Sequence, residues 1–190
     1  MKQQKKNIDE DYEIRSHTPN SSIWRSMRDD ILEIEQHHFG NKAFTEEVFE
    51  HYFSNPNTII VLINQRLTNR VVGFLFTVPA FEAYEDNFHP DRKISNQNRL
   101  DRTAYVEDIA IHKDHMGLGL GSRLMKTLEN ELWKQSYRFL ELDALTHNNY
   151  AANIAKNYAD RIIDQSGPHK SYYGPQVYFS IRLDDPRQEF

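Results

Sequence analysis

Three of the chain's seven glycines fall within five residues, at Gly117, Gly119 and Gly121. An apolar run, Ile109-Ala110-Ile111, comes shortly before them. Leucines spaced four apart follow them: Leu120, Leu124, Leu128 and Leu132. This pattern predicts a strand, a tight turn and an amphipathic helix. Glycines take positive φ angles and let a ligand approach the backbone, and a helix start offers N–H groups with the positive end of the dipole behind them. The segment therefore predicts an anion site suited to a pyrophosphate.

The remaining patterns predict one mixed α/β domain over residues 11–183. Helical spacing runs from Trp24 to His38, with Ser21 and Ser22 as expected caps, and a second helix follows Thr45. A further helix should run from Asn148 or Asn149 to about Tyr158. Strands are expected near 12–14, 58–63, 71–78, 103–111, 139–145 and 177–183, with a short one near Ile162. This order predicts a mixed central sheet of six or seven strands with about four helices.

Residues outside this domain are polar. We expect residues 1–10 to form a flexible tail and residues 184–190 a polar tail. Residues 80–102 read as a long polar loop, and residues 166–176 as turn-rich. Compact domains rarely carry a loop of that length without a use for it.

Composition excludes several classes of function. The 190 residues suffice for one domain, and a net charge of −5 disfavours a protein that neutralises nucleic-acid phosphates. No apolar stretch is long enough to span a membrane, and the N-terminus lacks the apolar region of a secretory signal. The absence of cysteine rules out thiolate metal sites and a cysteine nucleophile and fits a cytoplasmic location. The nine histidines form no metal-binding pattern, so no metal is expected.

Three ligand classes compete for the glycine turn. A P-loop needs Lys followed by Ser or Thr after its last glycine, whereas Ser122-Arg123 follows here. A dinucleotide fingerprint needs a glycine where Ser122 stands, and it follows the first strand of its unit rather than a late one. Coenzyme A is the third class.

The segment resembles the acyl-coenzyme-A-binding motif of the Gcn5-related N-acetyltransferase family, whose pattern is Arg/Gln-x-x-Gly-x-Gly/Ala. Here it reads Met116-Gly117-Leu118-Gly119-Leu120-Gly121, so the two later glycines match and Met116 replaces the leading basic or amide residue. The preceding segment, residues 105–111, is similar to the family's central strand. The order of elements matches the family over roughly residues 12–183. The resemblance therefore implies a Gcn5-related fold and acetyl-coenzyme A as co-substrate.

The resemblance also implies roles for individual residues. Glu107 corresponds to a position that receives the amine proton, often through water, and Asp108 would orient the loop or a substrate cation. Tyr158 would donate a proton to the leaving sulfur, although the family's Asn-x-x-Ala-x-x-x-Tyr spacing, counted from Asn149, reaches Lys156 instead. The residues expected at the coenzyme are Ile109, Ala110, Ile111, Met116, Gly117, Leu118, Gly119, Leu120, Gly121, Ser122 and Asn149.

The function expected is direct acetyl transfer to a primary amine of a small molecule or peptide. Strand alternation puts Glu107 and Asp108 on opposite faces, and partial desolvation is expected to raise the pKa of Glu107. Because no cysteine exists, no covalent intermediate is expected. The alternative is a non-catalytic acyl-coenzyme-A sensor or regulatory module. No nucleic acid or membrane partner is expected, and a homodimer is left open.

Overall fold

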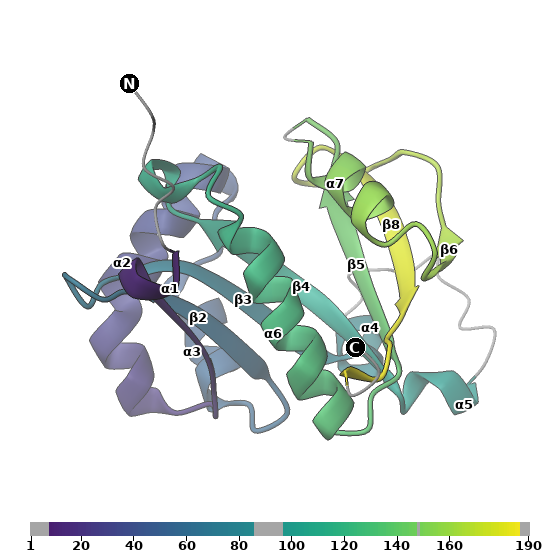
Figure 1. The fold of residues 1–190 in the computed structure, drawn as a ribbon, viewed down its shortest axis with the longest axis horizontal. Helices are drawn as coiled ribbons and strands as arrows, with labels where there is room; N and C mark the ends of the chain where they lie inside the picture. The colour runs from purple at the N-terminus through teal and green to yellow at the C-terminus, as the bar shows by residue number, and fades with distance from the viewer. Residues whose placement is uncertain (1–7, 86–96, 148, 187–190) are drawn as a thin grey trace. The chain divides into compact units, whose positions relative to one another are not determined.

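The computed structural model describes residues 8–85, 97–147 and 149–186. The strands are β1 (Tyr12–His17), β2 (Ile59–Gln65), β3 (Val71–Pro79), β4 (Thr103–Ile111), β5 (Phe139–Leu145), β6 (Ile162–Gln165), β7 (His169–Lys170) and β8 (Pro175–Arg182). The helices are α1 (Ile8–Asp11), α2 (Ser21–Phe39), α3 (Glu46–Ser54), α4 (Ala80–Glu85), α5 (Gln97–Leu100), α6 (Leu120–Lys134) and α7 (Tyr150–Asn157), with 3-10 turns η1 (Gly40–Lys42) and η2 (Lys113–His115) (Figure 1). None of these described helices is long and apolar enough to cross a membrane.

The strands form one mixed sheet, as the sequence predicts. They pair in the order β1-β2-β3-β4-β5-β8-β6, and β7 pairs with β8 beside this path. β1 and β2 are antiparallel, β4 and β5 are parallel, and β8 is antiparallel to β5, β6 and β7. The parallel register covers four residue pairs and ends at Val106 and Leu142. Glu107 is therefore the first β4 residue beyond that pairing.

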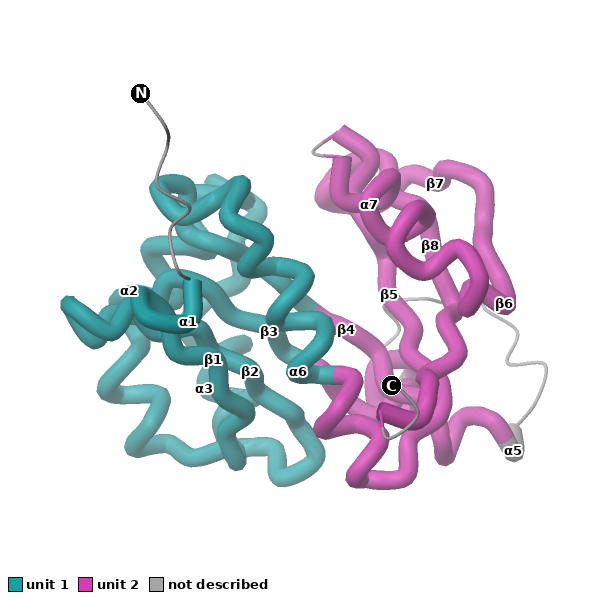
Figure 2. Tube along the Cα trace, viewed as in Figure 1, with its two compact units in different colours: residues 1–76, 108–128 teal, residues 77–107, 129–190 magenta. Residues whose placement is uncertain are grey.

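The chain packs as two compact units, which Figure 2 colours separately. The first comprises residues 1–76 and 108–128, and the second comprises residues 77–107 and 129–190, so β3, β4 and α6 contribute to both. In the first unit, Phe49 of α3 packs against Trp24, Phe74 and Phe76 with ring centroids 5.5–5.9 Å apart. In the second, α7 packs on β5 through buried Ala151 and Ile154.

Several local predictions need correction. Asn20, not Ser21 or Ser22, caps α2, because its side chain accepts a hydrogen bond of 2.7 Å from Ser22 N–H. Residues 8–10, expected in the flexible tail, belong to helix α1, and residues 1–7 and 187–190 lie outside the described residues. The predicted loop 80–102 contains α4 and α5 at its ends, with residues 86–96 outside the description, and the turn-rich segment 166–176 contains β7.

Candidate functional site

The glycine turn has the backbone that its sequence predicts. Gly117 and Gly119 have φ angles of +76° and +77°, which side-chain-bearing residues rarely adopt. Gly121 lies in the first turn of α6 without a positive φ. No described atom outside the immediate chain neighbourhood lies within 4 Å of where a Cβ would stand on any of these three glycines. The turn is therefore open, and a ligand can reach its backbone directly.

Charged side chains of η2, Lys113 and Asp114, come directly before the turn in the chain. The first turn of α6 contains no acidic residue, and Met116, exposed by 56%, brings no charge. Arg123 is nearby on α6, but its Nη1 pairs with Asp9 Oδ1 at 2.5 Å and lowers the pKa of that carboxyl. The backbone itself offers an anion N–H groups here, because the first N–H groups of any helix have no intrahelical acceptor.

The end of β4, which leads into the turn, alternates between buried and partly exposed residues. Asp108 and Ala110 are 7% and 4% exposed, whereas Glu107, Ile109 and Ile111 are partly exposed. This agrees with the expected opposite orientation of Glu107 and Asp108. Gly73 of β3 makes room for this strand, because a Cβ there would stand 2.6 Å from Ile111 Cδ1.

Helix α2 holds the same strand end from one side. His38 Nε2 lies 2.6 Å from the Ile111 carbonyl oxygen, and because a carbonyl only accepts, Nε2 carries the proton. Glu33 Oε1 lies 3.6 Å from His112 Nε2, and the His112 backbone N–H donates to Val72 O at 2.8 Å. These contacts fix the strand just before η2 and the glycines.

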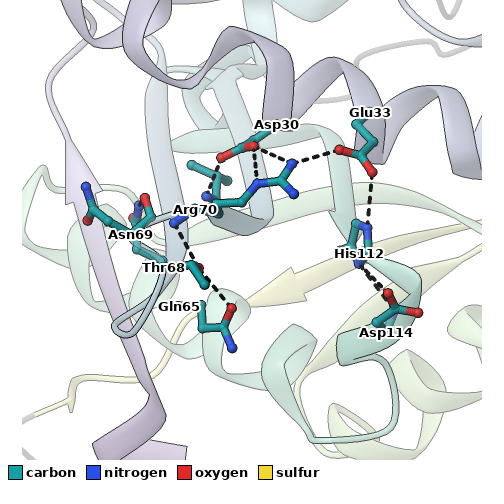
Figure 3. A network of polar contacts seen from close by, with 10 residues as sticks. Asp30, Glu33, Gln65, Thr68, Asn69, Arg70, His112 and Asp114 are labelled. Atoms are coloured by element: carbon teal, nitrogen blue, oxygen red, sulfur yellow. Dashed lines mark hydrogen bonds and ion pairs between the residues drawn. The ribbon is translucent and has the colours of Figure 1, made fainter.

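Figure 3 shows how this contact continues into a surface network. Arg70, after the β2–β3 turn, donates to Asp30 and Glu33 of α2 at 2.7 and 2.8 Å. The hydrogen bond from Arg70 lowers the pKa of Glu33, which also faces His112. His112 Nδ1 in turn accepts from the Asp114 N–H at 3.3 Å.

Asp108 meets a second buried carboxyl that the sequence analysis did not single out. Glu35 of α2 is 1% exposed, and its Oε1 accepts from the Phe44 N–H at 2.8 Å. Burial raises the pKa of Glu35, which also interacts with Asp108. A signal existed, because Glu35 lies four residues after Ile31 and three before His38, on the stripe predicted to be buried.

Tyr158 lies where the sequence predicts, at the end of α7, but its hydroxyl already has a partner. It is 7% exposed and donates to Glu129 Oε1 at 2.7 Å. Arg161 donates to the other oxygen of Glu129 at 2.8 Å and lies over the Tyr158 ring. Burial and the Glu129 carboxylate raise the pKa of Tyr158 strongly. Its role as a proton donor remains a prediction.

Asn149 occupies the N-cap position of α7 with a φ of +61°, and its side chain makes no cap hydrogen bond. It belongs to the second unit together with Glu107 and Tyr158, whereas residues 109–122 belong to the first. Apart from Asn149, the residues expected at the coenzyme all come from the segment 109–122, and their contact with it stays a prediction.

A further polar row in the second unit was also missed. Glu141 of β5 accepts hydrogen bonds from the Tyr84 hydroxyl and from Ser180 Oγ, the latter at 3.2 Å. Two residues on, Asp143 accepts from the Tyr105 hydroxyl at 2.7 Å. The alternation of acidic and apolar residues over 140–144 of β5 was the available signal. Among the described residues no group of three or more His, Asp or Glu side chains is arranged to hold a metal ion.

Solved structures resemble the chain in fold. The ribosomal-protein-S18-alanine N-acetyltransferase of Escherichia coli is 15% identical, with 94% of this chain and 99% of that chain covered at a TM-score of 0.62. An N-acetyltransferase of Staphylococcus aureus Mu50 is 15% identical, covering 91% and 99% at 0.63. A Salmonella typhimurium protein described as an acetyltransferase, solved with its cofactor acetyl-CoA, is 11% identical, covering 91% and 95% at 0.59.

At the level of sequence, no curated protein matches the chain. The model of the acetyltransferase (GNAT) family matches residues 24–158, which include most of α2 and the whole of β4, the glycine turn and α7. This confirms the resemblance drawn from the glycine turn and the order of elements. The chain belongs to the acetyltransferase (GNAT) family.

Proposed function

We propose that this chain transfers an acetyl group from acetyl-coenzyme A directly to a primary amine of a small molecule or peptide. Its family makes it an acyltransferase. The observation that supports the proposal most is the open turn at Gly117 and Gly119, placed between β4 and α6. Solved relatives of the same fold act on an S18 alanine or, in another case, on aminoglycosides, so they leave the acceptor of this chain open.

The coenzyme would be held mainly by backbone. The N–H groups from Gly117 to Ser122 suit its pyrophosphate, and Ile109 and Ile111 would pair with the pantetheine arm as a short added strand. Beyond Val106 the parallel pairing with β5 has ended, which agrees with such an addition. The coenzyme supplies a thioester, and this chain's residues orient it and manage protons.

Glu107 is the proposed acceptor of the amine proton. A protonated amine cannot attack a carbonyl, so a group near the end of β4 must take its proton directly or through water. Glu107 is partly exposed, which permits access, whereas Asp108 is nearly buried and suits orientation of the strand. Tyr158 is the proposed donor to the leaving sulfur. Its hydroxyl would first have to leave its hydrogen bond to Glu129 and turn toward the sulfur.

The experiment is a thiol-release assay with acetyl-coenzyme A over a panel of primary amines, preceded by calorimetric binding of the coenzyme alone. Coenzyme binding with turnover of at least one amine is the expected result. Tight coenzyme binding without turnover of any amine would contradict the enzyme proposal.

That second outcome would favour a non-catalytic acyl-coenzyme-A sensor. The commitment of the Tyr158 hydroxyl to Glu129 and the uncharged Met116 are the observations that keep this alternative. For either function we propose a cytoplasmic location, since the chain contains no cysteine.

A further inference from the structure

Glu35 is an unusual acidic residue of α2. Asp30 and Glu33 on the same helix bond to Arg70, and Asp29, with its side chain 90% exposed, pairs with Arg28 at 3.0 Å. Glu35 is instead 1% exposed, and the groups that act on its carboxyl are the Phe44 N–H and Asp108. A buried carboxylate without a cation is costly, so such a group tends to keep its proton.

The two oxygens of Glu35 have different surroundings. Oε1 accepts from Phe44 N–H, but no N–H or hydroxyl group of the described residues reaches the buried Oε2. Asp108 of β4, itself 7% exposed, is the side chain that acts on the Glu35 carboxyl as a hydrogen-bond partner. Two carboxylates can bond to each other only when one proton lies between them, and the pair then carries a single negative charge.

The position of this pair connects it to the coenzyme segment. Asp108 comes directly before Ile109–Ile111, and Phe44 lies in the segment between η1 and α3. Glu35 of α2 therefore contacts both that segment and β4. One helical turn after Glu35, His38 is the other titratable group of α2 on this strand, and its Nε2–H already bonds to Ile111 O. The shared proton and the His38 bond therefore hold opposite ends of the same four residues.

We propose that Glu35 is a positioning residue, which holds the coenzyme-binding end of β4 through one proton shared with Asp108. The inference rests on the proposed function in so far as the held segment binds the coenzyme. When the proton leaves, two buried negative charges face each other, and β4 and the residue 40–44 connection separate from α2. Coenzyme affinity then falls as pH rises.

The test compares the wild type with Glu35→Gln between pH 5 and 9. Glutamine has the shape of the protonated acid, because its NH2 donates to Asp108 and its oxygen accepts from Phe44 N–H. The dissociation constant of acetyl-coenzyme A, measured by calorimetry, should be about equal in the two proteins at the acid end. Above the pH where the proton leaves, the wild-type constant should rise relative to that of the variant, by at most about tenfold per pH unit for one proton.

Asp29→Asn on the exposed side of α2 is the matched control, and its constant should follow the wild type throughout. A ratio of wild-type to Glu35→Gln constants that does not change with pH overturns the proposal, whether the ratio is one or larger. Such a ratio would mean a structural contact without a titrating proton.

Urea unfolding without coenzyme separates this proposal from the proposed function. The folded chain holds the Glu35 proton more tightly than the unfolded chain, so the free energy of unfolding should fall as pH rises above the ordinary glutamate pKa, about 4.3. Glu35→Gln should remove that part of the slope. Equal slopes overturn the shared proton even if acetyl-coenzyme A binds, and absence of coenzyme binding in every protein contradicts the proposed function alone.

Discussion

A substitution at the glycine turn can act in two ways: it can strain the backbone, or it can block the approach of a ligand. At Gly119 a side chain would both force a residue with a Cβ into a φ of +77° and fill the space above the backbone. Gly121 offers the same space without a positive φ. Gly174, between β7 and β8, has a φ of +132°, and the nearest atom to a Cβ there is His147 Nδ1 at 4.0 Å. These three positions separate strain from obstruction.

We expect Gly119→Val to weaken acetyl-coenzyme A binding tenfold or more, about 1.4 kcal/mol, because the new side chain stands where the pyrophosphate must approach. Gly121→Ala should weaken it in the same direction, whereas Gly174→Ala should lower stability without changing affinity. Calorimetric titration of folded proteins checks all three. Unchanged affinity in folded Gly119→Val would remove the turn from the proposed site.

Glu107→Gln keeps the shape of the side chain and removes its basicity. We expect kcat/KM at pH 7 to fall by about 10²-fold or more, in the range of general base catalysis, with little change in coenzyme affinity. The loss should shrink at high pH, where free amine is abundant. Steady-state kinetics across pH test this, with the exposed Asp164→Asn as control, and near-normal activity at pH 7 would assign the proton to another acceptor.

Tyr158→Phe tests whether the Tyr158 hydroxyl serves stability, catalysis or both. The variant removes the hydroxyl that donates to Glu129, and we expect the free energy of unfolding to fall by about 1–3 kcal/mol, the cost of losing a hydrogen bond to a partly buried charged group. A denaturant titration measures this. A simultaneous fall in kcat, with coenzyme affinity kept, would support Tyr158 as the donor, whereas unchanged kcat would leave water in that role.

At the scale of elements, the approach of β3 to β4 depends on Gly73. A methyl group there would stand 2.6 Å from Ile111 Cδ1 and 3.3 Å from Ala110 O. We expect Gly73→Ala to destabilise the fold by about 1–3 kcal/mol through overpacking. Ile111→Val removes the closest atom, so the double variant should be less destabilised than the sum of the singles. Additive effects in urea unfolding would show that the two positions do not meet.

The sequence predicted elements well where one periodicity ran undisturbed. β2 and β3, read as apolar runs, are buried along nearly their whole length, and α6 follows its leucines. Termini were less predictable, since Asn20 competes with Ser21 and Ser22 as cap and only the backbone geometry decides among them. The two-residue β7 has too few residues for any periodicity, and it exists because β8 offers it an edge.

The candidate site also has features that the sequence predicts and features that it does not. The glycine turn is local, because Gly117, Gly119 and Gly121 fall within five residues. The sequence alone could therefore locate it. The Glu35–Asp108 and Tyr158–Glu129 contacts join residues 73 and 29 positions apart, and pairing at such separation follows from tertiary packing. A glutamate on a buried stripe shows that a partner is needed, but it does not show which one.

For the whole molecule, ligand binding should appear as added stability. A ligand that binds only the folded chain stabilises it by about 2.7 kcal/mol at a hundred times its dissociation constant. For a chain of this length we expect acetyl-coenzyme A at that concentration to raise the Tm by roughly 5–10 °C. Thermal scanning with and without coenzyme measures the shift, and no shift despite calorimetric binding would mean that the unfolded chain binds equally well.

The pairing of Asp9 with Arg123 has a consequence for ionic strength. Proteins that hold phosphates with free Lys or Arg side chains release counterions on binding, so their affinities fall steeply as salt increases. Here the guanidinium on the first turn of α6 is already neutralised by a carboxylate of α1. A phosphate that approaches Arg123 must therefore compete with Asp9, so Asp9→Asn should make coenzyme binding more sensitive to salt than it is in the wild type.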